Sequence, residues 1–302
     1  MKRLVLSVAL VALFATACDQ ATTDPEPAVA PDGAAEALFK NSKAASANAE
    51  VSAALVSIAR EKEAEMQAQF PNARLAGIQW LGDPNDGQMG GEIFFEDRGN
   101  KQLPVGWVAL DPRRGGRTNM LWSVDISIAP VGLAPDDLED AVSRAMETWA
   151  NTTACSNLPF VQVPVESDLW DILHAGFVLL PPGVLGMTLP FAFTGSDGHF
   201  TDIDGDGRVD YAFAVIVYQA DEGFWGIDVT DFPFVDFESV AFHETGHGLG
   251  QAHFGKAFIN KAGKVQISPR AVMNAGYSGL QQSLTGTDMA GHCSDWGSWP
   301  NR

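Results

Sequence analysis

The segment HETGHGLGQAH, residues 243 to 253, has residue types and spacing that could support metal chemistry. On an α-helix, His243 and His247 lie on one face a turn apart, which lets both imidazoles reach one tetrahedral Zn²⁺. Gly250 allows the chain to turn sharply out of the helix, so that His253 can supply a third ligand from the other side. The fourth position would then be open to water. The spacing therefore predicts a catalytic zinc site.

Two further features of this segment favour a functional site over a plain surface helix. Glu244 is next to the first histidine and points to the side of the face that carries the ligands, which suits a general base. Gly246, Gly248 and Gly250 each cost a helix about 1 kcal/mol relative to alanine. Such a cost is expected where a ligand or a turn must be accommodated. Asp236 is the expected cap where the helix begins.

The motif resembles the metzincin metalloproteases, whose signature is HExxHxxGxxH followed by a methionine-bearing turn. Residues 271 to 277, AVMNAGY, look like that turn, which implies that Met273 lies under the metal without binding it. Within the clan the resemblance is closest to the bacterial, matrixin-like family. It covers roughly residues 119 to 299, and its specific part is residues 243 to 277. It implies an α+β zincin domain with a twisted mixed sheet, an active-site helix and a Met-turn.

An acidic cluster precedes the predicted active-site helix. The residues at positions 1, 3, 5 and 9 of an EF-type calcium loop are Asp202, Asp204, Asp206 and Asp210. Position 12 is Phe213 and not the bidentate glutamate, so an EF-hand proper is excluded. The cluster predicts a Ca²⁺ site, and an acidic turn that faces water is the alternative.

The amino terminus has the pattern of an export signal. Lys2 and Arg3 precede the apolar run Leu4 to Phe14, and small residues follow at 15 to 17. We expect residues 1 to 17 to be a signal peptide and residues 18 to 32 to be a flexible tether. Ordinary signal-peptidase cleavage and a lipobox with lipidation at Cys18 both remain open. The localisation expected is therefore the cell envelope, as a bacterial lipoprotein, or the secreted fraction.

The two remaining cysteines and the charge balance limit the other properties. Cys155 and Cys293 form an even pair in an exported chain, which predicts a disulfide. The chain has 38 acidic residues against 19 Lys and Arg, a net charge of -19, so nucleic acid is excluded as the expected partner. We expect a monomer whose membrane contact is limited to a lipid anchor.

The pattern of elements predicts two regions along the rest of the chain. Residues 33 to 115 contain an amphipathic helical segment followed by short strands, and we expect a separate amino-terminal region that could be a propeptide. No cysteine-switch motif occurs there, so a matrixin-type latency mechanism is not implied. Residues 116 to 302 form the expected catalytic domain, which includes a helix from Pro135 to Trp149 with an apolar stripe.

Together these features predict an exported zinc-dependent endopeptidase, a hydrolase that acts on a protein or peptide substrate. Zinc would activate a water, and Glu244 would take its proton. Two alternatives stay open: a zinc amidase that acts on cell-wall peptide, and a catalytically inactive metal-binding surface lipoprotein. Glu244 favours the enzyme, because a purely structural site has no use for a carboxylate that is not a ligand.

Overall fold

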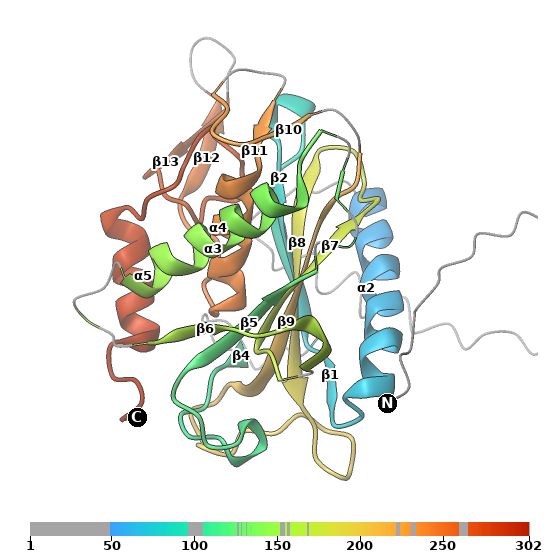
Figure 1. The fold of residues 1–302 in the computed structure, drawn as a ribbon, viewed down its shortest axis with the longest axis vertical. Coiled ribbons are helices and arrows are strands. Elements are labelled where there is room, and N and C mark those ends of the chain that lie inside the picture. The colour runs from blue at the N-terminus through green and yellow to red at the C-terminus, as the bar shows by residue number, and fades with distance from the viewer. Residues whose placement is uncertain are drawn as a thin grey trace, which may run out of the picture.

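The computed structural model describes residues 49–95, 105–125, 127, 129–130, 132–151, 155, 158–167, 169–221, 224–230, 234–259 and 265–301. The expected signal peptide, the tether and Cys18 lie outside the described residues. The described part is a mixed α/β fold in which one twisted mixed sheet is covered by helices on both faces (Figure 1). No helix of this part is long and apolar enough to cross a membrane.

The sheet has nine strands, seven of which follow one another in the order β3-β2-β8-β9-β7-β5-β6, while β1 pairs with β8 and β4 with β9. Strands β5, β6, β7 and β9 pair in parallel, and β2, β3 and β8 add antiparallel neighbours on the other side of β9. The strand bounds are β1 (Ala73–Leu75), β2 (Gly77–Gly82), β3 (Gly91–Phe94), β4 (Val105–Gly106), β5 (Met120–Val124), β6 (Phe160–Gln162), β7 (Ile172–Val178), β8 (Val184–Phe193) and β9 (Val209–Gln219).

Four α-helices, two small strand pairs and three short 3₁₀ helices (Pro84–Asp86, Pro112–Arg114 and Val165–Ser167) complete the described structure. The helices are α2 (Ala49–Gln69), α3 (Pro135–Asn151), α4 (Phe237–Gly248) and α5 (Gly286–Trp296). The pairs are β10 (Trp225–Gly226) with β11 (Val235–Asp236), and β12 (Lys256–Ile259) with β13 (Val265–Ser268). The order of these elements places the predicted metal-binding helix α4 after the last strand of the main sheet.

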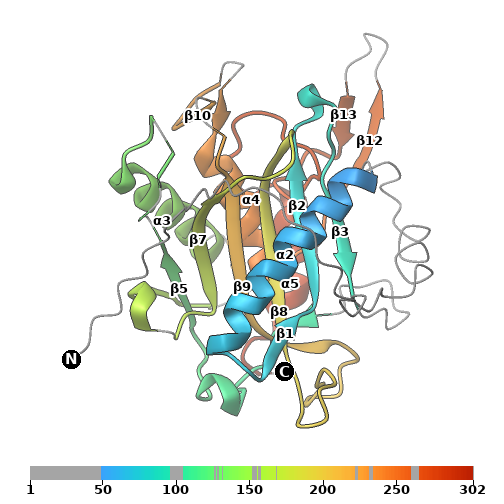
Figure 2. The ribbon, with the colours of Figure 1, turned by 90° about the vertical axis from the view of Figure 1, so that its right-hand side faces the viewer.

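Both faces of the central strands are buried, because a different set of helices covers each one. Helix α2 crosses one face, as Figure 2 shows, while α3 and α4 lie on the other. Along β9 the side chains alternate accordingly: Ala214 and Ile216 belong to the core under α3 and α4, and Val215 and Val217 to the core under α2. The sheet is therefore a rigid layer on which α4 can rest.

Helix α3 forms as its sequence predicts. Pro135 occupies its first position, and acidic residues follow in the first turn, where they suit the positive end of the helix. Every residue of its predicted apolar stripe is buried, from Leu138 to Trp149. The indole N–H of Trp149 donates to the backbone carbonyl of Phe242 at 2.9 Å. This contact joins α3 directly to α4.

The expected separation of residues 33 to 115 from the rest is not what the structure shows. Strands β1 and β2 pair with β8, and β4 pairs with β9, so this region supplies part of the main sheet. The chain at the expected boundary is also packed: the guanidinium of Arg114 is buried and its Nε lies 2.9 Å from Asp171 Oδ1. Strand pairing between distant segments has no local sequence signal, so the sequence does not indicate that β1, β2 and β4 belong to the main sheet.

Cys155 and Cys293, the two cysteines expected to pair, form a disulfide with a Cα–Cα distance of 5.7 Å. The bond ties the segment after α3 to helix α5, across 138 residues of sequence. Because Trp296 of α5 donates a hydrogen bond to the Leu249 carbonyl at 3.0 Å, the disulfide restrains the side of the molecule on which the end of α4 lies.

Candidate metal centre

Helix α4 begins and ends where its sequence requires. Asp236 is its N-cap and accepts a hydrogen bond from the backbone N–H of Ser239 at 2.8 Å. The helix ends at Gly248, and Gly250 then adopts a φ of +84°, a conformation that favours glycine. The chain leaves the helix axis there. This turn brings His253 back toward the face that carries His243 and His247.

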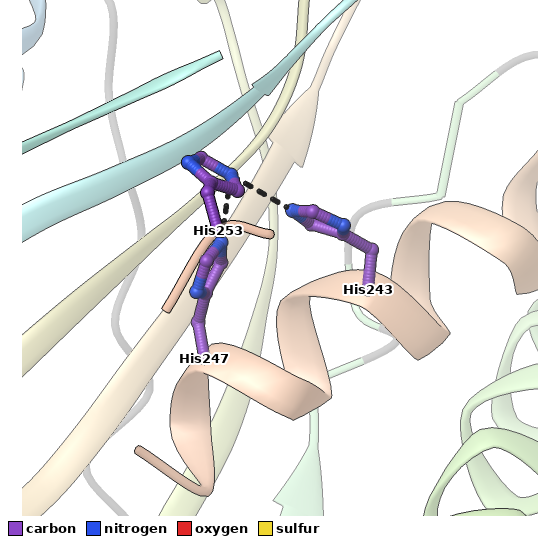
Figure 3. A group of neighbouring side chains, drawn as sticks. All are labelled: His243, His247 and His253. Atoms are coloured by element: carbon purple, nitrogen blue, oxygen red, sulfur yellow. Dashed lines mark hydrogen bonds between the residues drawn. The ribbon is translucent and has the colours of Figure 1, made fainter. Parts of the chain in front are cut away.

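The three histidines converge through the same ring nitrogen (Figure 3). His253 Nε2 lies 3.2 Å from His243 Nε2 and 3.1 Å from His247 Nε2. The donor atoms of all three residues therefore lie around one point, as the ligands of a single metal ion must. The sequence spacing and the folded geometry select the same three residues.

The opposite nitrogens of two rings are held by backbone carbonyls. His243 Nδ1 donates to Val272 O at 2.7 Å, and His247 Nδ1 donates to Gln251 O at 2.7 Å. A hydrogen on Nδ1 leaves the lone pair of a neutral imidazole on Nε2, so these carbonyls fix both the tautomer and the ring orientation. The Nε2 atoms are thereby prepared to bind a metal.

Burial keeps the three imidazoles neutral. Desolvation lowers the pKa of His243 to about 4, although the Val272 carbonyl and Asp288 oppose the shift. Desolvation, with repulsion from the neighbouring histidines, holds the pKa of His247 and His253 well below the usual range. Because a metal binds the deprotonated ring, the site needs little proton release to accept an ion near neutral pH.

Glu244 lies fully buried against strand β8. Its Oε2 accepts a hydrogen bond from the Thr188 hydroxyl at 2.6 Å, and its Oε1 has no hydrogen-bond partner among the described residues. Gly186 makes room for the carboxylate, since a Cβ there would lie 2.9 Å from Oε1. Desolvation raises the pKa of Glu244 to about 8, against the opposing effects of Thr188 and the Leu81 backbone. This environment produces a carboxylate that readily takes up a proton.

Met273 packs against the metal-binding helix from below. A Cβ added at Gly246 would lie 2.3 Å from Met273 Sδ, so the thioether fills the space that this glycine leaves on α4. The turn is held by Asp288 of α5, whose carboxylate accepts the backbone N–H groups of Val272 at 3.0 Å and Met273 at 3.1 Å. The same turn presents the carbonyl that holds His243.

Two residues that the sequence did not single out also contact the ligands. Gln79 of β2 places its amide nitrogen 2.9 Å from His247 Nδ1. Glu92 of β3 accepts the backbone N–H of His253 at 2.7 Å, and the same oxygen lies 3.6 Å from His253 Nδ1. These contacts span more than a hundred residues, so no local pattern indicates them. Both side chains come from the region that we expected to be separate.

The acidic cluster is brought together only in part. Carboxylate oxygens of Asp202, Asp204 and Asp210 lie within 4.8 Å of one another, and Asp206 is not part of this group. Burial and the neighbouring carboxylates raise the pKa of Asp204. Asp210 also forms an ion pair with Arg113 at 2.8 Å, which already supplies positive charge on one side. The cluster could hold a cation, with fewer carboxylates than its spacing suggests.

Comparison with known proteins adds no relative: no protein-family model matches the chain, and no curated protein is significantly similar to it.

Proposed function

We propose that the protein is a zinc-dependent endopeptidase of metzincin type. The observation that carries this proposal is the convergence of Nε2 atoms from His243, His247 and His253 beside a non-ligand carboxylate, Glu244. Three histidines with an open fourth position are typical of a catalytic zinc site, whereas structural zinc sites have four protein ligands.

The donor set fits zinc on two grounds. All three ligands are neutral imidazoles, which zinc binds well, and two of them are oriented through Nδ1 by backbone carbonyls. In addition, Glu244 has a buried oxygen, Oε1, for which the described part of the chain supplies no hydrogen-bond donor. Such an atom is costly to bury unless a donor such as a bound water satisfies it.

The chemistry follows from these residues. Bound zinc would lower the pKa of a water molecule and polarise the scissile carbonyl. Glu244 would take the proton of that water at its carboxylate and later pass it to the nitrogen of the leaving amine. Burial raises the pKa of Glu244 to about 8 when no metal ion is bound, and the charge of a bound cation would lower this pKa toward the range in which the carboxylate accepts a proton near neutral pH. Thr188 would hold the carboxylate in place through its hydroxyl.

Access to Glu244 requires a local movement. The side chain has no exposed surface, and Thr188 of β8 and the Leu81 backbone of β2 both lie against its carboxylate. A peptide can therefore reach the carboxylate only when the neighbouring chain moves aside.

The full burial of Glu244 also favours a second candidate, a metal-binding surface lipoprotein without catalytic activity. In such a protein the three histidines would bind zinc for stability, and a site closed to substrates would not impair its function. A zinc amidase that acts on cell-wall peptide remains a further alternative, because the same residues would serve any amide. Export, as a lipoprotein lipidated at Cys18 or as a freely secreted protein, and a monomeric state also belong to the proposal.

The proposal is tested by comparing the wild type with Glu244→Gln and His243→Ala. Glutamine keeps the size of the side chain but cannot accept the proton, so cleavage of casein should fall by about 10² to 10⁴ while one zinc per chain is retained. His243→Ala should lose both the zinc and the activity. Cleavage of purified cell wall instead of casein would select the amidase. Zinc binding without hydrolysis of either substrate would select the non-catalytic lipoprotein.

A further inference from the structure

The third metal ligand is the one whose position is not set by a helix. His243 and His247 are fixed by α4, whereas His253 lies in an irregular segment between Leu249 and the start of β12. A ligand in such a segment is positioned only by the tertiary contacts of its backbone and ring. The groups that make those contacts therefore determine how well the three nitrogens converge.

Glu92 makes the shortest of these contacts. Its Oε1 accepts the backbone N–H of His253 at 2.7 Å and lies 3.6 Å from Nδ1, on the side of the ring opposite the convergent Nε2. The teal ribbon of β2 and β3 accordingly passes beside His253 in Figure 3. One carboxylate oxygen thus fixes the backbone of the third ligand and lies close to its ring.

Gln79 extends the same arrangement to the second ligand. Gln79 and Glu92 are direct partners across β2 and β3, and the Gln79 amide nitrogen lies 3.4 Å from Glu92 Oε1. The same nitrogen lies 2.9 Å from His247 Nδ1 and 3.3 Å from Gln251 O. The pair therefore connects two ligands that come from different parts of the site.

The hairpin that carries this pair, residues 77–94, is held on both sides. Strand β2 pairs with β8, and on its other side Gly82 O accepts the N–H of Tyr277 at 2.8 Å. Ile78 and Trp80 of β2 are buried in the core under α2. Removing the hairpin would therefore expose the apolar surface that these side chains and their neighbours under α2 bury together.

We propose that Glu92 is a positioning residue for the metal centre, which it serves by fixing His253, and that the hairpin 77–94 is a permanent part of this centre and not a removable propeptide. The inference rests on the zinc site of the proposed function but not on hydrolysis, so it is tested through metal affinity. Partners of this kind typically change metal affinity by 10- to 100-fold.

The experiment measures the zinc dissociation constant of the full mature chain by competition with a chromophoric chelator. Glu92→Ala should weaken zinc binding by about 10- to 100-fold. Glu92→Gln keeps an acceptor for the His253 N–H and should recover part of the loss. Asp86→Ala is the matched control, because Asp86 is exposed at the turn of the same hairpin and contacts no ligand. Circular dichroism of the metal-free proteins verifies that each variant folds.

Each outcome decides one point. A dissociation constant for Glu92→Ala within about threefold of the wild type overturns the proposal while leaving the zinc site intact. Casein cleavage that increases in Glu92→Ala at unchanged zinc affinity also overturns it, because the hairpin would then be a cover. A wild type that binds zinc, with weaker binding in Glu92→Ala, supports the positioning role even where no substrate is cleaved. A wild type that binds no zinc refutes both this proposal and the proposed function.

Discussion

Replacing Gly246 by alanine should reveal how tightly the metal-binding helix is packed. Alanine in a helix interior is favoured over glycine by about 1 kcal/mol, so propensity alone predicts a more stable protein. The structure predicts instead that the alanine variant does not gain stability. A Cβ at this position would lie 2.3 Å from Met273 Sδ and 2.8 Å from the Trp149 ring. Both groups are buried, with exposures of 2% and 0%, and must shift to admit the methyl group.

The expected change in the free energy of unfolding follows from two opposing effects. Overpacking of a well-packed core costs about 1 to 3 kcal/mol, which exceeds or cancels the gain in propensity. Gly248 is the matched control on the same helix, because a Cβ there would lie 3.3 Å or more from the Ile172 side chain. That contact is tight, but the end of an isoleucine can adjust. We expect Gly246→Ala to be less stable than Gly248→Ala by about 1 to 3 kcal/mol.

Urea unfolding of the zinc-loaded proteins, followed by tryptophan fluorescence, measures the difference directly. Gly246→Ala should also bind zinc more weakly, since a displaced Met273 carries with it the turn whose Val272 carbonyl holds His243. Equal stability of the two alanine variants would show that Met273 and Trp149 are not packed against Gly246, and the account of the turn beneath the metal would then fail.

Three further predictions concern stability. Desolvation lowers the pKa of His174 from 6.5 to about 3, so this side chain stays neutral in the folded state while it gains a proton in the unfolded state as pH falls below 6.5. The free energy of unfolding should therefore fall with decreasing pH, by up to about 1.4 kcal/mol per pH unit. His174→Gln should reduce this slope in urea titrations at pH 4 to 6. An unchanged slope in the His174→Gln variant would show that His174 does not cause this pH dependence. Replacing Cys155 and Cys293 by serine opens a loop of 138 residues and should cost about 5 kcal/mol by the chain-entropy model, seen as an earlier urea midpoint than that of the wild type. Saturating Ca²⁺ at constant zinc should raise the melting temperature if the loop 202–210 binds it, and equal melting in EGTA would show an acidic turn without a cation.

The parts of the structure that the sequence predicted are those set by local patterns. The stripe from Leu138 to Trp149 has helical period, and the structure buries it against α4. The histidine spacing depends on the geometry of one helix and one glycine turn, so it defines the ligand set without knowledge of the sheet. The role of Asp236 as a cap is local in the same way.

The parts that could not be predicted depend on contacts between distant segments. Nothing near Gln79 or Glu92 indicates that β2 and β3 join the sheet beside β8 and contact the histidines. The burial of Glu244 likewise depends on Thr188 and Leu81, which precede it by many residues. For the same reason the boundary expected at residue 115 falls between strands of one sheet.

The central claim is that His243, His247 and His253 hold one zinc ion and leave a position open for water. X-ray absorption at the zinc edge of the loaded protein tests it directly, because the spectrum counts imidazole ligands and detects sulfur. We predict one zinc per chain with three imidazoles and one oxygen ligand at about 2.0 to 2.1 Å. A sulfur ligand, a fourth imidazole or a chain that retains no zinc would contradict the account.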